Sequence, residues 1–362
     1  MRKVIVAPTA FKGTLGPSAV ARALSAGVTT VWPEASVIEL PLADGGNGTL
    51  ESYRALRGGR LETLRVSGPL GARVSARLLR TKSDAVIESA EACGLHLVPP
   101  GQRDPLRAST FGVGELVLAG ARGGSFDVIL GLGGSATVDG GTGMARALGW
   151  RFLDARGRPL PEGGGALRDL AHIEPPAREL EATALALCDV DNPLSGRLGA
   201  ARVYGPQKGA GSDEVEALEA GLVRLAEVLE SQHGLTPGDL PGAGAAGGLG
   251  FGARAFLGAD LVSGAVWMIE RAGLVESLAG AGLVITGEGR YDLQSGMGKV
   301  TGRVMEAARS ALLPVLLVCG RIAGPIPPGV LPVDGGGRQL TANDLALLTG
   351  SGCRAIAGED RL

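Results

Sequence analysis

Short, continuous apolar runs that end in glycine-rich or acidic loops are the feature that most constrains this chain. Clear examples are Val4–Ala7, Leu283–Thr286 and Leu313–Val318. A strand that is apolar at every position is buried on both faces, which is typical of a parallel sheet covered by helices. After the first run, apolar residues recur every four positions over Val20–Val28 and predict a helix. The resulting β-α-β-α order predicts an α/β protein with a doubly wound parallel sheet.

A different pattern begins near residue 60. Within Arg73–Arg80, apolar and polar residues alternate, whereas the first runs do not alternate. Alternation indicates strands with one solvated face, and such strands are usually antiparallel. The runs Val128–Leu130 and Leu185–Val190 then restore the parallel α/β pattern. We therefore predict a second, mixed subdomain that begins near residue 60.

Composition excludes several kinds of partner. The chain has 35 Lys and Arg against 37 Asp and Glu, a net charge of -2, so no basic field would attract nucleic acid or an anionic membrane. No stretch reaches the roughly 18 apolar residues of a membrane span, and the N-terminus lacks signal-peptide features. The four cysteines lie far apart with no C-x-x-C pair, which favours a reducing compartment. We expect a cytoplasmic protein that binds neither nucleic acid nor membrane.

The chain holds 61 glycines, and they gather most densely in Gly131–Gly143, between an apolar run and a predicted helix. Such a loop exposes backbone N–H groups and can bind an anion; the alternative is a set of tight turns at positive φ. Residues 131–136 also fit the dinucleotide fingerprint G-x-G-x-x-A, which would make the protein an NAD(P)-dependent hydroxy-acid oxidoreductase. That alternative needs an acid about twenty residues further on. The nearest candidate is Asp154, in a polar stretch.

Other catalytic motifs are missing from the sequence. Lys299 follows Gly298, but a P-loop would need glycine where Leu293 stands. H-E-x-x-H and G-x-S-x-G do not occur, and the three histidines have no neighbours that would complete a metal cluster. A second G-x-G-x-x-G match, Gly242–Gly247, follows prolines instead of a strand. The sequence therefore argues against a P-loop kinase, a zinc protease and a Ser-His-Asp hydrolase.

Four acidic residues follow predicted strands: Asp44, the pair Asp189 and Asp191, and Glu288. Open α/β sheets bind ligands at the carboxyl ends of their strands. Carboxylates beside glycine or asparagine at such ends suit Mg²⁺ bound together with phosphate. Each acid alone is equally well explained as a helix N-cap or a turn former. Together they favour a metal and phosphate site, and the single residue between Asp189 and Asp191 would direct both carboxylates to one side of an extended chain.

Three lysines lie beside glycines: Lys12, Lys208 and Lys299. An ammonium that reaches over a glycine loop can neutralise phosphoryl oxygens as a point charge. An ordinary solvated lysine is the alternative for each of them. Taken with the acids, the lysines favour phosphoryl transfer.

Seven segments, in order along the chain, resemble the type I glycerate kinases. They are Ala7–Leu15, Ala43–Thr49, Gly131–Gly143, Cys188–Leu194, Gly205–Ala210, Gly242–Gly252 and Val284–Arg290. The resemblance runs from residue 4 to about residue 305. It implies an enzyme that uses ATP and Mg²⁺ to phosphorylate D-glycerate, in many members giving 2-phosphoglycerate.

The resemblance also implies two α/β domains. One is a flavodoxin-like parallel-sheet domain built from both chain ends, which we place at residues 1–62 plus 288–362, and the other is an inserted mixed-sheet domain of restriction-enzyme-like topology at residues 63–287. The sequence departs from the family pattern at Thr9–Ala10, where Asp-Ser is usual, and at Asn47, where an acid is usual. Beyond about residue 320 it diverges, so we expect altered final elements in the first domain.

These considerations assign roles to particular residues. We expect Asp189 or Asp191 to accept the glycerate hydroxyl proton while the other holds Mg²⁺, and Lys12 to act as a catalytic charge. Substrate or phosphate binding is assigned to Gly133, Gly134, Ser135, Thr137, Asn192, Lys208, Glu288 and Lys299, and metal binding to Asp44, Asp189 and Asp191. Whether Gly133–Thr137 holds the glycerate carboxylate or a phosphate stays open. The expected partners are D-glycerate and ATP; a homodimer is compatible with this function, and a non-catalytic nucleotide-binding regulator is a further alternative.

Overall fold

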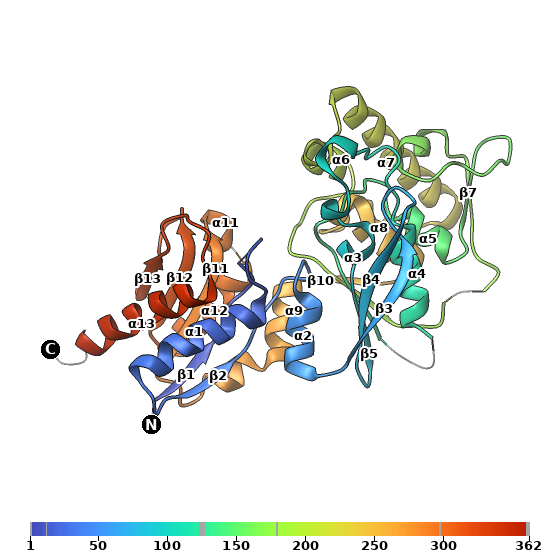
Figure 1. Cartoon of the computed structure of the whole chain (residues 1–362). Helices are drawn as coiled ribbons and strands as arrows, with labels where there is room; N and C mark the ends of the chain where they lie inside the picture. Colours follow the sequence, from blue (N-terminus) through green and yellow to red (C-terminus); the bar gives the residue numbers. More distant parts are fainter. Residues whose placement is uncertain (1, 12, 123–126, 179, 297, 360–362) are drawn as a thin grey trace. The chain divides into compact units, whose positions relative to one another are not determined.

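The computed structural model describes residues 2–11, 13–122, 127–178, 180–296 and 298–359 (Figure 1). The chain divides into two compact units. Unit 1 comprises Met1–Asp44, Glu51–Gly58 and Gly264–Leu362, and unit 2 comprises Gly45–Leu50 and Gly59–Ser263. Both chain ends therefore belong to unit 1, as the blue and red colours of Figure 1 show.

Unit 1 is built on a five-stranded sheet whose order is β13-β12-β11-β1-β2, with every neighbouring pair parallel. Its strands are β1 Lys3–Val6, β2 Ser36–Glu39, β11 Leu283–Tyr291, β12 Val315–Ile322 and β13 Val330–Asp334. Counted in chain order within the unit, this is the 2-1-3-4-5 order of flavodoxin-like folds. The expected flavodoxin-like domain is thus confirmed.

The helices of unit 1 are α1 Pro17–Val31, α2 Thr49–Arg57, α9 Gly264–Ala272, α10 Leu274–Ser277, α11 Leu293–Gly296, α12 Val300–Ser310 and α13 Ala342–Glu359. Helices α1, α11, α12 and α13 pack against the strands of unit 1, and its other helices lie further from them (Figure 1). Helices α1 and α13 pack closely because Gly27 has no side chain: a Cβ there would collide with Ala346 O and lie 2.7 Å from Thr349 Cβ. Buried Val4, Ile285 and Val318 form the sheet side of this core.

Unit 2 contains a six-stranded mixed sheet of order β10-β9-β6-β5-β4-β3. Its strands are β3 Arg60–Ser67, β4 Arg73–Arg80, β5 Asp84–Glu88, β6 Asp127–Gly131, β9 Ala184–Leu187 and β10 Asp260–Val262. The pairs β3–β4 and β4–β5 are antiparallel, while β5, β6, β9 and β10 run parallel. The change near residue 60 therefore marks antiparallel edge strands of a mixed sheet, as the sequence predicts.

The remaining elements of unit 2 surround this sheet. The helices are α3 Ala90–Cys93, α4 Phe111–Gly120, α5 Thr142–Ala147, α6 Ala200–Tyr204, α7 Ser212–His233 and α8 Ala245–Leu257, and β7 Arg151–Leu153 pairs with β8 His172–Glu174 in a separate two-stranded sheet. One core lies against the main sheet and includes Ile87, Leu116 and Leu130. A second core lies under α7 and includes Leu222 and Phe251.

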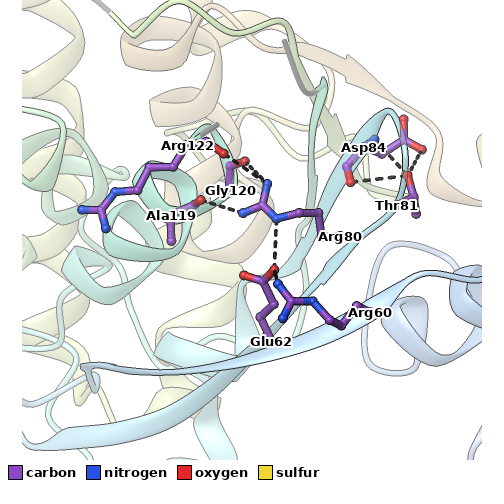
Figure 2. A network of polar contacts seen from close by, with 8 residues as sticks. All are labelled: Arg60, Glu62, Arg80, Thr81, Asp84, Ala119, Gly120 and Arg122. Carbon is purple, nitrogen blue, oxygen red and sulfur yellow. Dashed lines mark hydrogen bonds and ion pairs between the residues drawn. The ribbon is translucent and has the colours of Figure 1, made fainter. Parts of the chain in front are cut away.

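Arg80 fastens the antiparallel edge of unit 2 to the end of α4 (Figure 2). Its guanidinium donates to the carbonyl oxygens of Ala119 and Gly120, each at 2.9 Å, and its Nε lies 3.1 Å from Glu62 on β3. The last carbonyls of a helix have no partner within the helix, so Arg80 satisfies groups that would otherwise need water. This cluster therefore has a structural role at the antiparallel edge. The candidate site described below lies at the parallel strands instead.

The observed division differs from the predicted one. Residues 264–287, which we expected in the inserted domain, belong to unit 1. The physical reason is that the first half of β11 pairs with β1, with Val284 opposite Ile5, so the strand and the helices that lead into it cannot be separated from that sheet. We expected residues 45–50 in the flavodoxin-like domain, but Gly45–Leu50 belongs to unit 2.

Candidate active site

The candidate site of unit 2 lies at the carboxyl edge of its parallel strands. Strands β5, β6, β9 and β10 end at Glu88, Gly131, Leu187 and Val262, and because they are parallel these ends meet at one edge of the sheet. Ligands of open α/β sheets bind at such an edge. The loops that follow these four ends carry most of the site residues that the sequence predicts.

Gly45–Leu50 packs directly onto this edge, and glycine makes the approach possible. A Cβ on Gly131 would collide with Gly45 O, and a Cβ on Gly45 would lie 2.6 Å from Leu187 O. Gly45 also has a φ of 90°, in the region that favours glycine. Gly45 and Gly131 therefore allow the two backbones to come into contact.

Glu88 secures the same segment and was missed by the sequence analysis. Its Oε1 accepts hydrogen bonds from the backbone N–H of Gly48 at 3.1 Å and of Leu50 at 2.8 Å. Glu88 is only 6% exposed, and this burial raises its pKa to about 7, although the two backbone hydrogen bonds act in the opposite direction. An acid at the last position of an apolar strand is the signal that could have identified it.

The glycine loop after β6 is held by backbone hydrogen bonds. Leu95 N donates to Gly134 O at 2.7 Å, and Ala136 N donates to Cys93 O at 2.7 Å. Gly133 is partly exposed and Gly134 is exposed. Gly133 N donates a long hydrogen bond of 3.5 Å to Ser89 Oγ, so the most accessible backbone of this turn is at Gly134.

Ser135, Thr137 and Lys208 are buried directly beneath that turn. Lys208 is 3% exposed, and its ammonium donates to Ser135 Oγ at 2.9 Å and to Thr137 O at 2.7 Å. Burial lowers the pKa of Lys208 to about 8, while the nearby Cys93 and Asp139 oppose this shift. The structure therefore brings Lys208 to the predicted loop, but from the interior of unit 2.

Asp139, which the sequence analysis did not single out, organises the far end of the loop. It is fully buried, and its carboxylate accepts hydrogen bonds from Thr110 N, Thr110 Oγ1, Gly141 N and Gly143 N at 2.8 to 3.1 Å. Burial raises its pKa, and these four donors offset part of the shift. Asp139 thereby connects the loop to the starts of α4 and α5.

Asp189, Asp191 and Asn192 lie on the loop after β9. Asp189 is half-buried, and its Oδ1 accepts a hydrogen bond of 2.7 Å from Ser263 Oγ, just beyond β10. Asp191 is exposed. Asn192 accepts from Tyr204 Oη at 2.7 Å and donates to Leu198 O at 2.8 Å. Both ends of the Asn192 amide are thus used to shape its own loop.

Unit 1 carries the other candidate residues. Glu288 lies on β11 and accepts a hydrogen bond of 3.0 Å from Ser295 Oγ. Burial raises the pKa of Glu288, and hydrogen bonds from Thr301 and Ser295 partly offset this increase. Lys299 immediately precedes α12 and adds a positive charge near Glu288. Asp44 is half-buried at the end of the first segment of the unit. Lys12 lies outside the described residues.

The acids do not form a ready-made metal cluster. Among the described residues, no group of three or more His, Cys, Asp or Glu side chains could hold a metal ion. Mg²⁺ in phosphoryl-transfer enzymes is commonly held by only one or two carboxylates together with substrate phosphates. Asp189 and Asp191 lie on one loop of unit 2, after β9.

The dinucleotide-binding alternative disagrees with the local structure. In that fingerprint a helix opens directly at the glycine turn, but after β6 the next helix, α5, begins only at Thr142. Asp154, the acid that this alternative needs, follows β7 of the small sheet and pairs with Arg158 at 2.8 Å. The second glycine match, Gly242–Gly247, runs into a kink at the start of α8, where Ala246, Gly247 and Gly248 have positive φ.

No helix within the described part of the chain is long and apolar enough to cross a membrane. The four cysteines are all buried and free, with no disulfide between them.

Comparison with known proteins assigns the family. The model of the "Glycerate kinase family" matches residues 4–327. A glycerate kinase of Halalkalibacterium halodurans is 42% identical over 327 residues, covering 89% of this chain and 86% of its own. A glycerate 2-kinase of Escherichia coli is 41% identical, covering 88% of this chain and 85% of its own. The protein belongs to the glycerate kinase family.

A solved structure extends the comparison to the whole chain. The crystal structure of a putative glycerate kinase 2 from Salmonella typhimurium LT2 superposes with a TM-score of 0.87 at 37% identity, and each chain is covered completely. The family model ends at residue 327, before β13 and α13. The sequence expectation of divergence there is therefore compatible with conservation of the overall fold.

Proposed function

We propose that the protein transfers the γ-phosphoryl group of ATP to the 2-hydroxyl of D-glycerate and releases 2-phosphoglycerate and ADP. Family membership supports the kinase reaction, and the Escherichia coli relative named glycerate 2-kinase supports the position of transfer. The observation that supports the proposal is the edge of unit 2, where a partly exposed glycine turn follows β6 and a loop with two carboxylates follows the adjacent strand β9. Such a reaction mainly requires positioning and charge balance.

In this proposal the pair Asp189 and Asp191 performs the proton and metal work. One carboxylate accepts the proton of the attacking hydroxyl, and the other holds Mg²⁺, which supplies charge neutralisation at the phosphates when bound. Asp189 is already oriented by Ser263. Asp191 is exposed and available to a ligand.

The candidates of unit 1 act on the phosphates in the same proposal. Lys12 and Lys299 would neutralise phosphoryl oxygens, Glu288 would contribute to phosphate binding, and Asp44 would contribute a carboxylate to metal binding. Lys12→Met is expected to lower kcat by about a hundredfold, the order of effect for one preorganised electrostatic group. Steady-state kinetics of the folded variant check this, and a kcat near wild type would reduce Lys12 to a surface lysine.

The direct test is a coupled assay of ADP formation with D-glycerate and Mg²⁺, with the phosphorylated carbon identified by NMR. We expect ADP in proportion to 2-phosphoglycerate. Tartronate and glyoxylate serve as alternative substrates, and NAD reduction with each hydroxy acid serves as the control for oxidoreductase activity. ADP formation that does not exceed background, or a 3-phosphorylated product, would contradict the proposal.

A further inference from the structure

The ammonium of Lys208 is buried without an acidic partner in direct contact. Its hydrogen bonds go to a hydroxyl, Ser135 Oγ, and to a carbonyl, Thr137 O. Within the described residues no carboxylate lies in ion-pair distance of it, and its third face lies over the ring of Tyr204, with 5.9 Å between Nζ and the ring centroid. A buried charge is costly unless it is compensated, so this position calls for an explanation.

The Ser135 hydroxyl transmits the charge of Lys208 towards the glycine turn. Its oxygen accepts a hydrogen bond from the ammonium, so its own proton must point elsewhere. Among the residues that the structure describes, no acceptor receives that proton. A hydroxyl that accepts from a cation is a stronger donor, and Gly133 and Gly134 on the same turn are the accessible positions.

The neighbouring strand identifies the anion. Gly131 of β6 pairs with Leu187 of β9, so Gly133 and Asp189 each follow their strand by two residues at adjacent strand ends. Adjacent strands are about 4.8 Å apart. A 2-hydroxy acid carries its carboxylate and hydroxyl on adjacent carbons, which suits a carboxylate at one strand end and a reacting hydroxyl at the next.

We infer that Gly133–Ser135 binds the carboxylate of the 2-hydroxy acid substrate, and that Lys208 is a positioning residue that strengthens this binding from below through Ser135. The inference rests on the proposed function, since it uses Asp189 as the neighbour of the reacting hydroxyl. It assigns substrate recognition to unit 2. A phosphate of ATP at the same turn is the competing ligand that the experiment must separate.

Substrate binding and protonation of Lys208 should therefore be coupled. The groups that face its ammonium are Cys93, Asp139 and the ring of Tyr204, and of these Asp139 already favours the charged form. A bound carboxylate would favour the charged form of Lys208 further. Because Lys208 in the free protein titrates near pH 8, binding at a pH slightly above this value should draw a proton from solution.

The experiment compares Lys208→Met and Ser135→Ala with Lys82→Met, which changes an exposed lysine of the same unit. We expect Lys208→Met to raise KM for D-glycerate by about tenfold or more, because the Ser135 hydroxyl loses the positive charge that strengthens its hydrogen bond to the carboxylate, while KM for ATP changes by less than about twofold. Ser135→Ala should raise KM for D-glycerate at least as much, because it removes the hydroxyl through which Lys208 acts. Thermal denaturation of each variant confirms folding.

A second readout separates positioning from simple structural support. Calorimetry of D-glycerate binding at about pH 8.5, in two buffers with different ionisation enthalpies, should show proton uptake by the wild type and none by Lys208→Met. An increase in KM for ATP instead of D-glycerate, or equal proton uptake by both proteins, would overturn the inference. Absence of kinase activity in the wild type would instead contradict the proposed function, and glycerate-linked proton uptake would still test the anion site.

Discussion

Polar side chains near the candidate loops differ in burial between the two units. In unit 2, Asp139, Lys208 and Glu88 are 0%, 3% and 6% exposed, and each makes hydrogen bonds that fix a loop. In unit 1, the candidate residues Asp44, Glu288 and Lys299 are only partly buried. The loops that Asp139, Lys208 and Glu88 hold in unit 2 therefore have a fixed shape. The candidate residues of unit 1 are more accessible to solvent, as are Asp189 and Asp191 in unit 2.

This difference has an energetic basis. A buried polar group is costly unless it is hydrogen-bonded, so a buried network must be complete and admits few alternative arrangements. Asp139, with four donors, meets this condition. The comparison indicates that the loops held by Asp139, Lys208 and Glu88 in unit 2 are more rigid than the surroundings of the candidate residues in unit 1. The predictions below test that contrast.

The largest expected effect is on activity, from Asp189→Asn and Asp191→Asn. Each change keeps the side-chain volume but removes a charge that we assign to proton transfer or metal binding, so kcat should fall by at least about a hundredfold. Two close carboxylates repel, so thermal stability should stay equal or rise slightly. Steady-state kinetics and thermal denaturation check both points, with exposed Asp239→Asn as the matched control. Full activity in both variants, or loss of activity through unfolding, would make the pair structural.

The next effect is on stability, from Asp139→Asn. Its carboxylate accepts from four donors inside unit 2, and an amide would direct its own N–H groups at some of them. We expect a loss of about 3 kcal/mol in the free energy of unfolding, measured by urea denaturation. Asp191→Asn provides the exposed comparison. If both variants unfolded at the same urea concentration, the buried network of unit 2 would not be the rigid element that we describe.

A smaller loss is expected from Gly45→Ala. Both the positive φ and the close approach to Leu187 O resist a side chain. Gly71→Ala is the matched control, because Gly71 has a φ of 87° and open space around its Cβ position. We expect Gly45→Ala to be the more destabilising by about 2 kcal/mol in chemical denaturation. Equal losses of stability in Gly45→Ala and Gly71→Ala would show that the backbone at Gly45 can move away from Leu187. That result would argue against a rigid sheet edge in unit 2.

The sequence predicts much of this architecture because burial on two faces leaves a clear local signal. The apolar runs Val4–Ala7 and Leu283–Thr286 fall on parallel strands, and the alternating segment Arg73–Arg80 falls on an antiparallel one. The acids at strand ends can also be predicted, because each comes directly after an apolar run that marks a buried strand. Glu88 belongs with these acids, because it ends strand β5. Asp44 and Glu288 likewise come directly after apolar runs.

Other features depend on partners that are distant in the chain. Lys208 is buried because Ser135 and Thr137 arrive to accept its hydrogen bonds, and no local pattern distinguishes it from a solvated lysine. Asp139 stands in a glycine loop that looks exposed, yet Thr110 covers it from α4. The domain boundary was misplaced for a similar reason, because only the pairing of β11 with β1 shows where residues 264–287 belong.

The smallest expected effect concerns the pH dependence of Glu88. Burial raises its pKa to about 7 in the folded protein, against an ordinary value of 4.5. Between these values the folded state binds more protons than the unfolded state, so this group contributes a stability that is lost as pH rises through about 4.5 to 7. Glu88→Gln keeps an oxygen that can accept from Gly48 and Leu50 but cannot ionise. We expect the variant to be more stable than wild type at pH 8 by about 1 kcal/mol, since weaker hydrogen bonds offset most of the relieved desolvation.

Urea denaturation from pH 4 to pH 8 measures this contribution. The wild type should lose more stability across the range than Glu88→Gln, and the two curves should converge at the acidic end, where Glu88 is protonated in both states. Glu91→Gln is the control for a nearby charge, because Glu91 raises the pKa of Glu88 as a neighbouring carboxylate. Parallel curves for wild type and Glu88→Gln would mean that Glu88 titrates normally. In that case Gly45–Leu50 would be held by its glycine packing alone, and the contrast between the buried groups of unit 2 and the partly exposed ones of unit 1 would narrow to Asp139 and Lys208.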